Sequence, residues 1–197
     1  EGPGRDALCI NCHRTNVGPV IGIAKDFEQT RQADLGRSCV GCHMPEVTRS
    51  MAVVTKDDGT IYTAPEREGR AHTLRTPRDP GFLARAFDLT PTRTQSGATL
   101  AIANDAGHRV PGLKTRSMTF VVTALDEAGA ELGTAELMID SESPLLVGTP
   151  QYVLVDTGGK RAATLAVRGT HTWVGPPEPV VFLDEVLGLD PPADGPR

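Results

Sequence analysis

The residue types best suited to chemistry occur twice in one pattern, a Cys-x-x-Cys pair followed at once by histidine. Both copies lie in the first quarter of the chain: Cys9, Cys12 and His13, then Cys39, Cys42 and His43. A Cys-x-x-Cys-His run is the attachment signature of c-type haem. Its thiols form thioethers with the two vinyl groups of one macrocycle, and the histidine ligates the iron from one face. The pattern therefore predicts two covalently bound haems, with His13 and His43 as their first axial ligands.

Other uses of four cysteines fit the spacing less well. A zinc site built from two Cys-x-x-Cys pairs usually separates them by about 15–20 residues, and the gap between Cys12 and Cys39 is longer. Zinc also does not require a histidine after each pair. Two redox-active dithiols would be expected within βαβ units, and no such pattern surrounds either pair. Haem attachment remains the favoured interpretation.

Each iron needs a second axial ligand, and three histidines remain for the two positions: His72, His108 and His171. Low-potential carriers commonly use histidine on both faces, whereas methionine raises the potential. His108 lies on a stiff turn between Gly107 and a Pro-Gly pair, and we favour it as a ligand. His72 is favoured too, because the arginines around it could pair with haem propionates. His171, beside the lone Trp173, is the weaker candidate.

Methionine ligands are formal alternatives. Met44 directly follows His43 and cannot reach the opposite face of the same haem. The others are Met51, Met118 and Met138, and the last two lie in strand-like runs, where methionine is more often core filler. Bis-histidine ligation of both irons is therefore the expectation.

Composition excludes several classes of protein. The net charge of −5 and the pI near 5.5 argue against nucleic acid as a partner. No apolar run approaches the ~20 residues of a transmembrane helix. The chain begins at Glu1 rather than Met, so we expect that a signal peptide or a longer N-terminal part has been removed.

The first half of the chain has little periodicity. Residues 1–50 contain too few apolar side chains for a core of their own, and haem would supply the missing apolar surface. One helix is predicted within residues 23–39, ending near Gly36. A hairpin is predicted over 51–64 around Asp58-Gly59, and a short amphipathic helix over 82–89.

From about residue 97 the pattern becomes β-rich. Six short runs are separated by Gly, Pro, Asp and Asn turns: residues 98–104, 117–126, 130–139, 150–156, 162–169 and 179–187. The fold class predicted is mainly β with an irregular, sparsely helical haem-binding region. We expect a dihaem region at 1–95, an immunoglobulin-like β-sandwich at 96–190 and a surface tail at 191–197.

Three runs together resemble the multihaem c-type cytochromes of bacteria and archaea: CVGCHMP at 39–45, AHTLRTPRDPGFL at 71–83 and NDAGHRVPG at 104–112, followed by alternating strands. The resemblance spans about residues 39–125. It implies that His72 and His108 are distal ligands of bis-histidine haems. The family includes periplasmic carriers and extracellular cytochromes that polymerise into haem-stacked filaments. Its members usually carry four or more haem motifs, whereas this chain carries two.

The expected function is electron transfer and not enzymatic catalysis, because a six-coordinate iron has no open position for a substrate. The chain could be a filament subunit or a soluble periplasmic carrier or relay subunit. A dihaem enzyme of the peroxidase or nitrogen-oxide reductase type, with one open iron, is the further alternative. Expected partners are other redox proteins or copies of the chain, joined through the Gly/Pro-rich ends at 2–6 and 190–197. Haem is attached outside the cytoplasmic membrane, so a periplasmic or extracellular location is expected.

Overall fold

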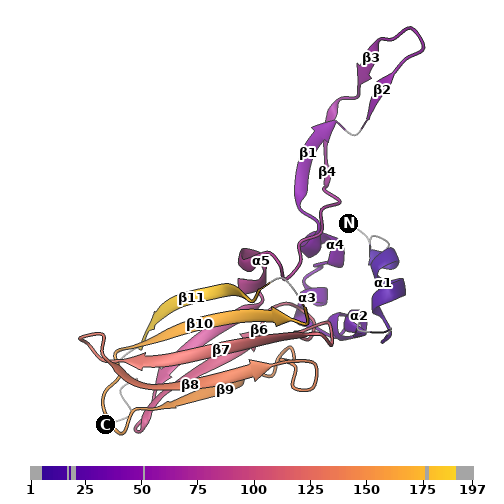
Figure 1. The fold of residues 1–197 in the computed structure, drawn as a ribbon. Coiled ribbons are helices and arrows are strands. Elements are labelled where there is room, and N and C mark those ends of the chain that lie inside the picture. The colour runs from indigo at the N-terminus through magenta and orange to yellow at the C-terminus, as the bar shows by residue number, and fades with distance from the viewer. Residues whose placement is uncertain (1–5, 17, 19–20, 51, 176–177, 190–197) are drawn as a thin grey trace.

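The computed structural model describes residues 6–16, 18, 21–50, 52–175 and 178–189. The predicted tail at 191–197 and nearly all of the two Gly/Pro-rich ends lie outside these ranges. The described chain is mainly β and sparsely helical, as predicted. It consists of two packed sheets, a cluster of short helices at one end of them, and a long two-stranded arm that projects away from both (Figure 1).

Seven strands form the two antiparallel sheets. One sheet has the order β5 (Phe87–Arg93), β6 (Gly97–Asn104) and β9 (Gln151–Asp156); the other has the order β11 (Val180–Gly188), β10 (Thr164–Trp173), β7 (Arg116–Leu125) and β8 (Glu131–Ile139). Each of the six predicted β-rich runs overlaps one of the strands β6 to β11, and β10 extends four residues beyond the end of its predicted run. Strand β5 pairs with β6 along its whole length, so the three-stranded sheet begins before residue 96.

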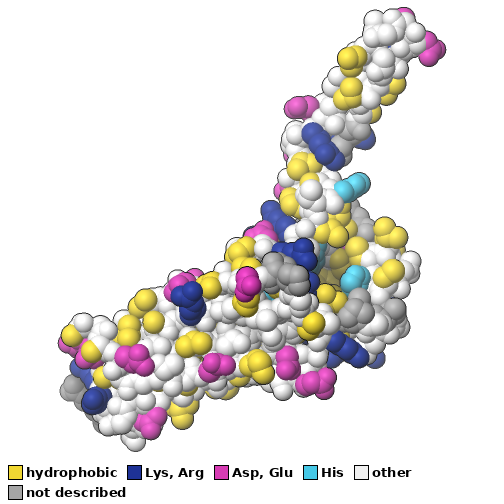
Figure 2. All heavy atoms as spheres, viewed as in Figure 1, with side chains coloured by type: hydrophobic (Ala, Val, Ile, Leu, Met, Phe, Trp, Pro, Cys, Tyr) yellow, Lys and Arg dark blue, Asp and Glu magenta, His cyan; other side chains and the backbone are white. Residues whose placement is uncertain are grey.

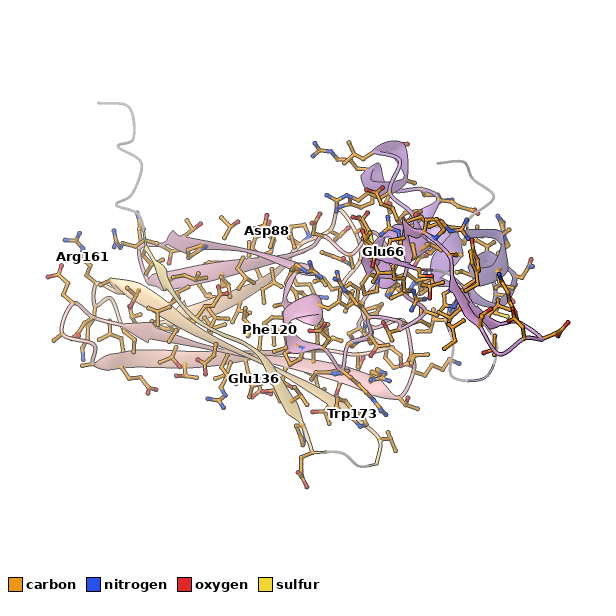
Figure 3. All side chains as sticks on the ribbon, turned by 90° about the horizontal axis from the view of Figure 1, so that it is seen from above. Glu66, Asp88, Phe120, Glu136, Arg161 and Trp173 are labelled. Atoms are coloured by element: carbon orange, nitrogen blue, oxygen red, sulfur yellow. The ribbon has the colours of Figure 1, made fainter. Side chains whose placement is uncertain are left out.

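The two sheets share one core because alternate residues of their strands point inward. In β6 and β7 every second side chain is buried. The middle of this core is a triangle of rings, Phe87, Phe120 and Phe182, whose centres are 5.1–5.6 Å apart. Aliphatic side chains and Met118 fill the remainder. Figure 3 shows Phe120 between the sheets and Trp173 near the helical end of the molecule.

The arm is built from two antiparallel strand pairs in succession. Strand β1 (Glu46–Ser50) pairs with β4 (Glu66–Arg70). Beyond them β2 (Val53–Thr55) pairs with β3 (Ile61–Thr63), which confirms the hairpin predicted around Asp58-Gly59. Gly59 has a φ of +81° in its turn, a conformation that favours glycine. The far end of the arm contacts neither sheet (Figure 1).

The helices are shorter than the sequence predicts. In place of one helix within residues 23–39 there are two, α2 (Ile23–Phe27) and α3 (Arg31–Asp34). They precede Gly36, whose φ of +71° is left-handed. Helix α5 (Pro80–Ala84) begins earlier than predicted, because Asp79 caps it by accepting a hydrogen bond from the backbone N–H of Phe82 at 3.0 Å. It also ends earlier, because residues from 87 onward pair with β6 instead.

Two further helices, α1 (Ala7–His13) and α4 (Cys39–His43), carry the two Cys-x-x-Cys-His motifs. No helix among the residues that the structure describes is long and apolar enough to cross a membrane.

Candidate haem-binding site

The helix that holds the second motif is fixed at its N-terminus. The Ser38 hydroxyl accepts a hydrogen bond from the backbone N–H of Gly41 at 2.9 Å. The carboxylate of Asp6, which precedes α1, accepts from the N–H groups of Cys39 and Val40 at 2.9 and 3.2 Å. An acidic group suits a helix N-terminus. Asp6 therefore ties the start of the first motif to the start of the second.

The environment of Cys39 keeps its thiol protonated. Burial, followed by the negative charge of Asp6, raises the pKa of Cys39 to about 12. The structure describes Cys9, Cys39 and Cys42 as partly buried and Cys12 as exposed. None of the four forms a disulfide, so all four thiols are free for the thioether bonds that the motif predicts.

Both motifs open onto two adjoining cavities beside the sheets. One has a volume of about 250 Å³ and an apolar lining that includes Ile23, Phe27 and Leu74. The other has a volume of about 840 Å³, within the usual range for ligand pockets. The residues that line both include His13, Cys42, His43 and His108. Figure 2 shows hydrophobic and histidine side chains gathered where the helices meet the base of the arm.

The imidazoles of His43 and His108 face the same space. Their ring centres are 6.4 Å apart and their planes differ by 14°. Two metal–imidazole bonds of about 2 Å each, with about 1.1 Å from each bonded nitrogen to its ring centre, would set the centres about 6.2 Å apart. The separation of the two ring centres therefore matches that of two imidazoles bonded to one metal ion. The edge of the Phe82 ring packs against His43, with centres 5.1 Å apart and planes at 66°.

A hydrogen bond of Nδ1 orients each of the two imidazoles. Nδ1 of His43 hydrogen-bonds the Arg75 carbonyl at 2.8 Å, and Nδ1 of His108 hydrogen-bonds the carbonyl of Arg109 at 2.8 Å. A carbonyl accepts, so each Nδ1 carries the proton and each Nε2 is left for a metal. Burial lowers the pKa of His108, which favours the neutral form that ligates iron.

The loop that carries His108 is anchored internally. Asn104 donates from its side-chain amide to the carbonyls of His108 and Leu145, at 2.9 and 2.7 Å. Gly107 has a φ of +80°, and a Cβ on it would come within about 3.1 Å of the side chains of Gln32 and Phe27. Glycine is therefore required at this position both by the backbone conformation and by the space.

The same loop is also anchored to the helices below it. Arg109 forms a two-pronged ion pair with Asp26 of α2, at 2.5 and 2.9 Å, and this contact lowers the pKa of Asp26. The Gln32 side chain of α3 donates to the Asp105 carboxylate at 2.5 Å. The sheet and the helices thus hold His108 from both sides.

The other candidate histidines lie elsewhere. His13 lines both cavities, and its Nδ1 is buried with no partner among the described residues. His72 follows β4 at the base of the arm, is exposed and lines neither cavity. His171 is fully buried in β10, with its ring centre 4.8 Å from that of Trp173, and also lines neither cavity. The structure therefore brings His13, His43 and His108 together, but not His72 or His171.

Sequence reasoning overlooked several arginines of the larger cavity. The run around His72 identified Arg70 and Arg75, and both line it. Three more come from distant segments: Arg37, Arg85 and Arg116. No local pattern marks them, because only the fold brings these segments to one cavity.

Comparison with known proteins shows a similar fold in one solved structure. No family model matches the sequence, and no curated protein is significantly similar to it. Among solved structures, the fold is similar to that of a penta-haem cytochrome c552 from Thermochromatium tepidum, with a TM-score of 0.58 and 16% sequence identity. The match covers 96% of this chain and 58% of that cytochrome, so this chain spans little more than half of its length. The chain therefore shares its fold with a multihaem c-type cytochrome.

Proposed function

We propose that the chain transfers electrons through two covalently bound c-type haems, one attached at Cys9 and Cys12 and the other at Cys39 and Cys42. The observation that carries this proposal is the histidine pair opposite the second motif, with ring centres 6.4 Å apart in a cavity that this motif lines. The fold shared with a penta-haem cytochrome supports it.

Both irons take two imidazoles in this proposal. His43 and His108 hold one haem from opposite faces. His13 holds the other, and His72 is its proposed second ligand. The exposure of His72 outside the cavities supports ligation across a contact, in which His72 of one copy reaches the iron at His13 of another.

The residues of the site favour electron transfer over catalysis. Haem iron with imidazole on both faces supplies a one-electron couple and leaves no position for a substrate. The Arg75 and Arg109 carbonyls fix the two imidazoles, and Phe27 and Leu74 contribute to the apolar lining of the smaller cavity. A rigid ligand set changes little between redox states. We therefore propose that the chain is not an enzyme.

The more specific proposal is that copies of the chain associate into a polymer in which their haems are linked. The far end of the arm exposes apolar side chains on both faces: Val53, Val54, Ile61 and Tyr62. An isolated two-stranded hairpin is marginally stable in water, so a second copy covering this end would stabilise it. A soluble carrier or relay subunit is the alternative that applies if the chain remains monomeric.

The proposed location and partners follow from the covalent attachment of haem. Haem attachment places the chain in the periplasm or outside the cell, with other redox proteins or further copies of itself as partners.

We infer an immunoglobulin-like arrangement for the two sheets. Its support is the strand order, in which β7 leaves the β5-β6 sheet for the opposite one, β9 returns, and β10 and β11 cross again.

Intact mass and the pyridine haemochrome spectrum test the haem proposal. The unmodified chain should carry two haems. The double variants Cys9→Ser/Cys12→Ser and Cys39→Ser/Cys42→Ser should each carry one, and only the second should lose the low-spin signal of the His43–His108 pair. An unmodified chain without covalent haem, or one that binds zinc instead, would overturn the proposal.

A further inference from the structure

The larger cavity has an excess of positive charge. Five arginines line it, and Asp105 is its one acidic residue among those described. Asp105 is already hydrogen-bonded by Gln32. Arg70 is neutralised by an ion pair with Glu46 at 2.8 Å. The remaining arginines have no carboxylate of the described chain within ion-pair distance: Arg37, Arg75, Arg85 and Arg116.

Arg116 is the most constrained of these cations. It begins β7, lines the cavity, and its Nε is buried with no hydrogen-bond partner among the described residues. Burial and the positive charge of Arg78 both lower the pKa of Arg116. Arg116 is only partly buried as a residue, but a guanidinium whose buried N–H lacks an acceptor is unfavourable for a folded chain. The position therefore calls for an anion that the described chain does not supply.

The neighbours of Arg116 hold its guanidinium in place without neutralising it. The guanidinium carbon lies 5.6 Å from the centre of the Trp173 ring, and Arg78 lies 5.8 Å from the same ring. One terminal nitrogen donates to Nε2 of His171 at 3.5 Å. Because burial lowers the pKa of His171 to about 4, this imidazole is neutral at pH 7 and acts as an acceptor.

We propose that Arg116 binds a propionate carboxylate of the haem held by His43 and His108, with Trp173 and His171 as positioning residues. This inference rests on the proposed function, because it needs a haem in the cavity. Arginine suits a carboxylate through its planar fork of donors. The residues that carry the inference lie in β7 and β10, in the sheet region rather than in the Cys-x-x-Cys-His helices.

The pairing has a measurable consequence for the haem. Reduction adds one electron to the iron, and a cation held nearby stabilises the reduced form. Removing the charge of Arg116 should therefore lower the reduction potential of one haem only. We expect a change of about tenfold in its reduction equilibrium, which is about 59 mV for a one-electron couple.

The test is a spectroelectrochemical titration of the holoprotein and three variants. Arg116→Gln removes the charge, and Arg116→Lys keeps it. Arg168→Gln is the matched control, because Arg168 is an exposed arginine of β10 whose carboxylate partner, Asp184, lies 3.4 Å away. We expect the lowered potential in Arg116→Gln alone, with Arg116→Lys retaining most of the original value.

The haem count and the ligation state separate failure of this inference from failure of the proposed function. Absence of haem overturns both. If both haems are low-spin and have the same potentials in Arg116→Gln as in Arg168→Gln, the inference is wrong and the proposed function stands. A phosphate series identifies the source of the anion: if the effect of the substitution depends on phosphate concentration, a solution anion occupies the site and the propionate assignment is wrong.

If Arg116→Gln does not fold, an experimental structure of the holoprotein decides the question. A propionate oxygen at about 2.7–2.9 Å from the Arg116 guanidinium supports the inference. A water molecule or a free anion in that place overturns it.

Discussion

The proposed pairing of His43 with His108 is the residue-scale feature on which the site depends. The His108 imidazole lies 6.4 Å from that of His43, centre to centre, and is oriented by the Arg109 carbonyl. His108→Ala should convert one of two haems to the high-spin state, because no other described histidine pairs with His43. The visible and EPR spectra report this change.

Two observations control that experiment. Circular dichroism should show unchanged sheets, because His108 lies in a loop outside β6 and β7. His171→Phe should leave both haems low-spin. If both haems of His108→Ala stay low-spin, another group ligates the iron and the assignment of His108 is wrong.

The buried His171 predicts a pH dependence of stability. Burial, followed by the charge of Arg116, lowers its pKa from 6.5 to about 4, and the Pro77 carbonyl opposes the shift. Between these values the unfolded chain binds a proton that the folded chain excludes. Stability is therefore retained above pH 6.5 and lost as the pH falls toward 4, by up to about 3 kcal/mol.

Denaturant unfolding of the holoprotein and of His171→Phe across this range measures the effect. Arg116, Arg78 and Trp173 surround the same position, so the variant changes one titrating group within a fixed set of charges. The difference in unfolding free energy between the two proteins should depend on pH. Parallel curves would contradict the prediction.

At this scale the sequence predicts candidate ligands more readily than the environment around them. The spacing of Cys39, Cys42 and His43 is local, so it can be recognised without a structure. His108 stands out because its Gly and Pro-Gly neighbours stiffen the turn. Arg116 could not be recognised, because its role depends on the proximity of Trp173 and the cavity, which only the folded chain creates.

At the scale of elements, the ion pair between α2 and the loop after β6 holds His108 in place. Arg109 and Asp26 are joined by two hydrogen bonds, and their side chains are 35% and 22% exposed. Asp26→Asn should reduce the unfolding free energy by about 1–2 kcal/mol. It should also increase the high-spin fraction of one haem, because the loop is then held less firmly.

The surface pair Arg168 and Asp184 provides the matched control, since both side chains are more than half exposed. Asp184→Asn should change stability by less than about 0.5 kcal/mol and leave the spectrum unchanged. Equal effects of the two substitutions would show that the Asp26 contact does not position His108.

The strands were more predictable than the helices for a physical reason. The buried side chains of β6 and β7 recur every second residue, and the sequence alone shows this two-residue period of apolar residues. The short helices near Gly36 and Phe82 span too few residues for their period to set their bounds, and their ends depend on Asp79, Gly36 and pairing with β6. The arm at residues 46–70 was predicted only at its tip, because its inner strands carry no strong apolar alternation.

At the scale of the whole molecule, the exposed end of the arm predicts self-association. Val54 and Tyr62 are paired across the β2–β3 hairpin and are 52% and 48% exposed. Val54→Lys/Tyr62→Lys should prevent association while both haems remain attached, because charged groups resist burial. Sedimentation velocity measures the association state, and Val186→Lys on β11, 65% exposed, is the control.

A chain that remains monomeric at high concentration without any substitution would support the soluble carrier instead.

The most direct test of the central claim is the EPR spectrum of the ferric holoprotein, interpreted together with its near-infrared bands. We predict two low-spin signals, both of the bis-histidine type, in the assembled protein. In a disassembled sample one of them should give way to a high-spin signal if His72 acts across a contact. A methionine–iron band or a high-spin signal as the main species of the assembled protein would contradict bis-histidine ligation.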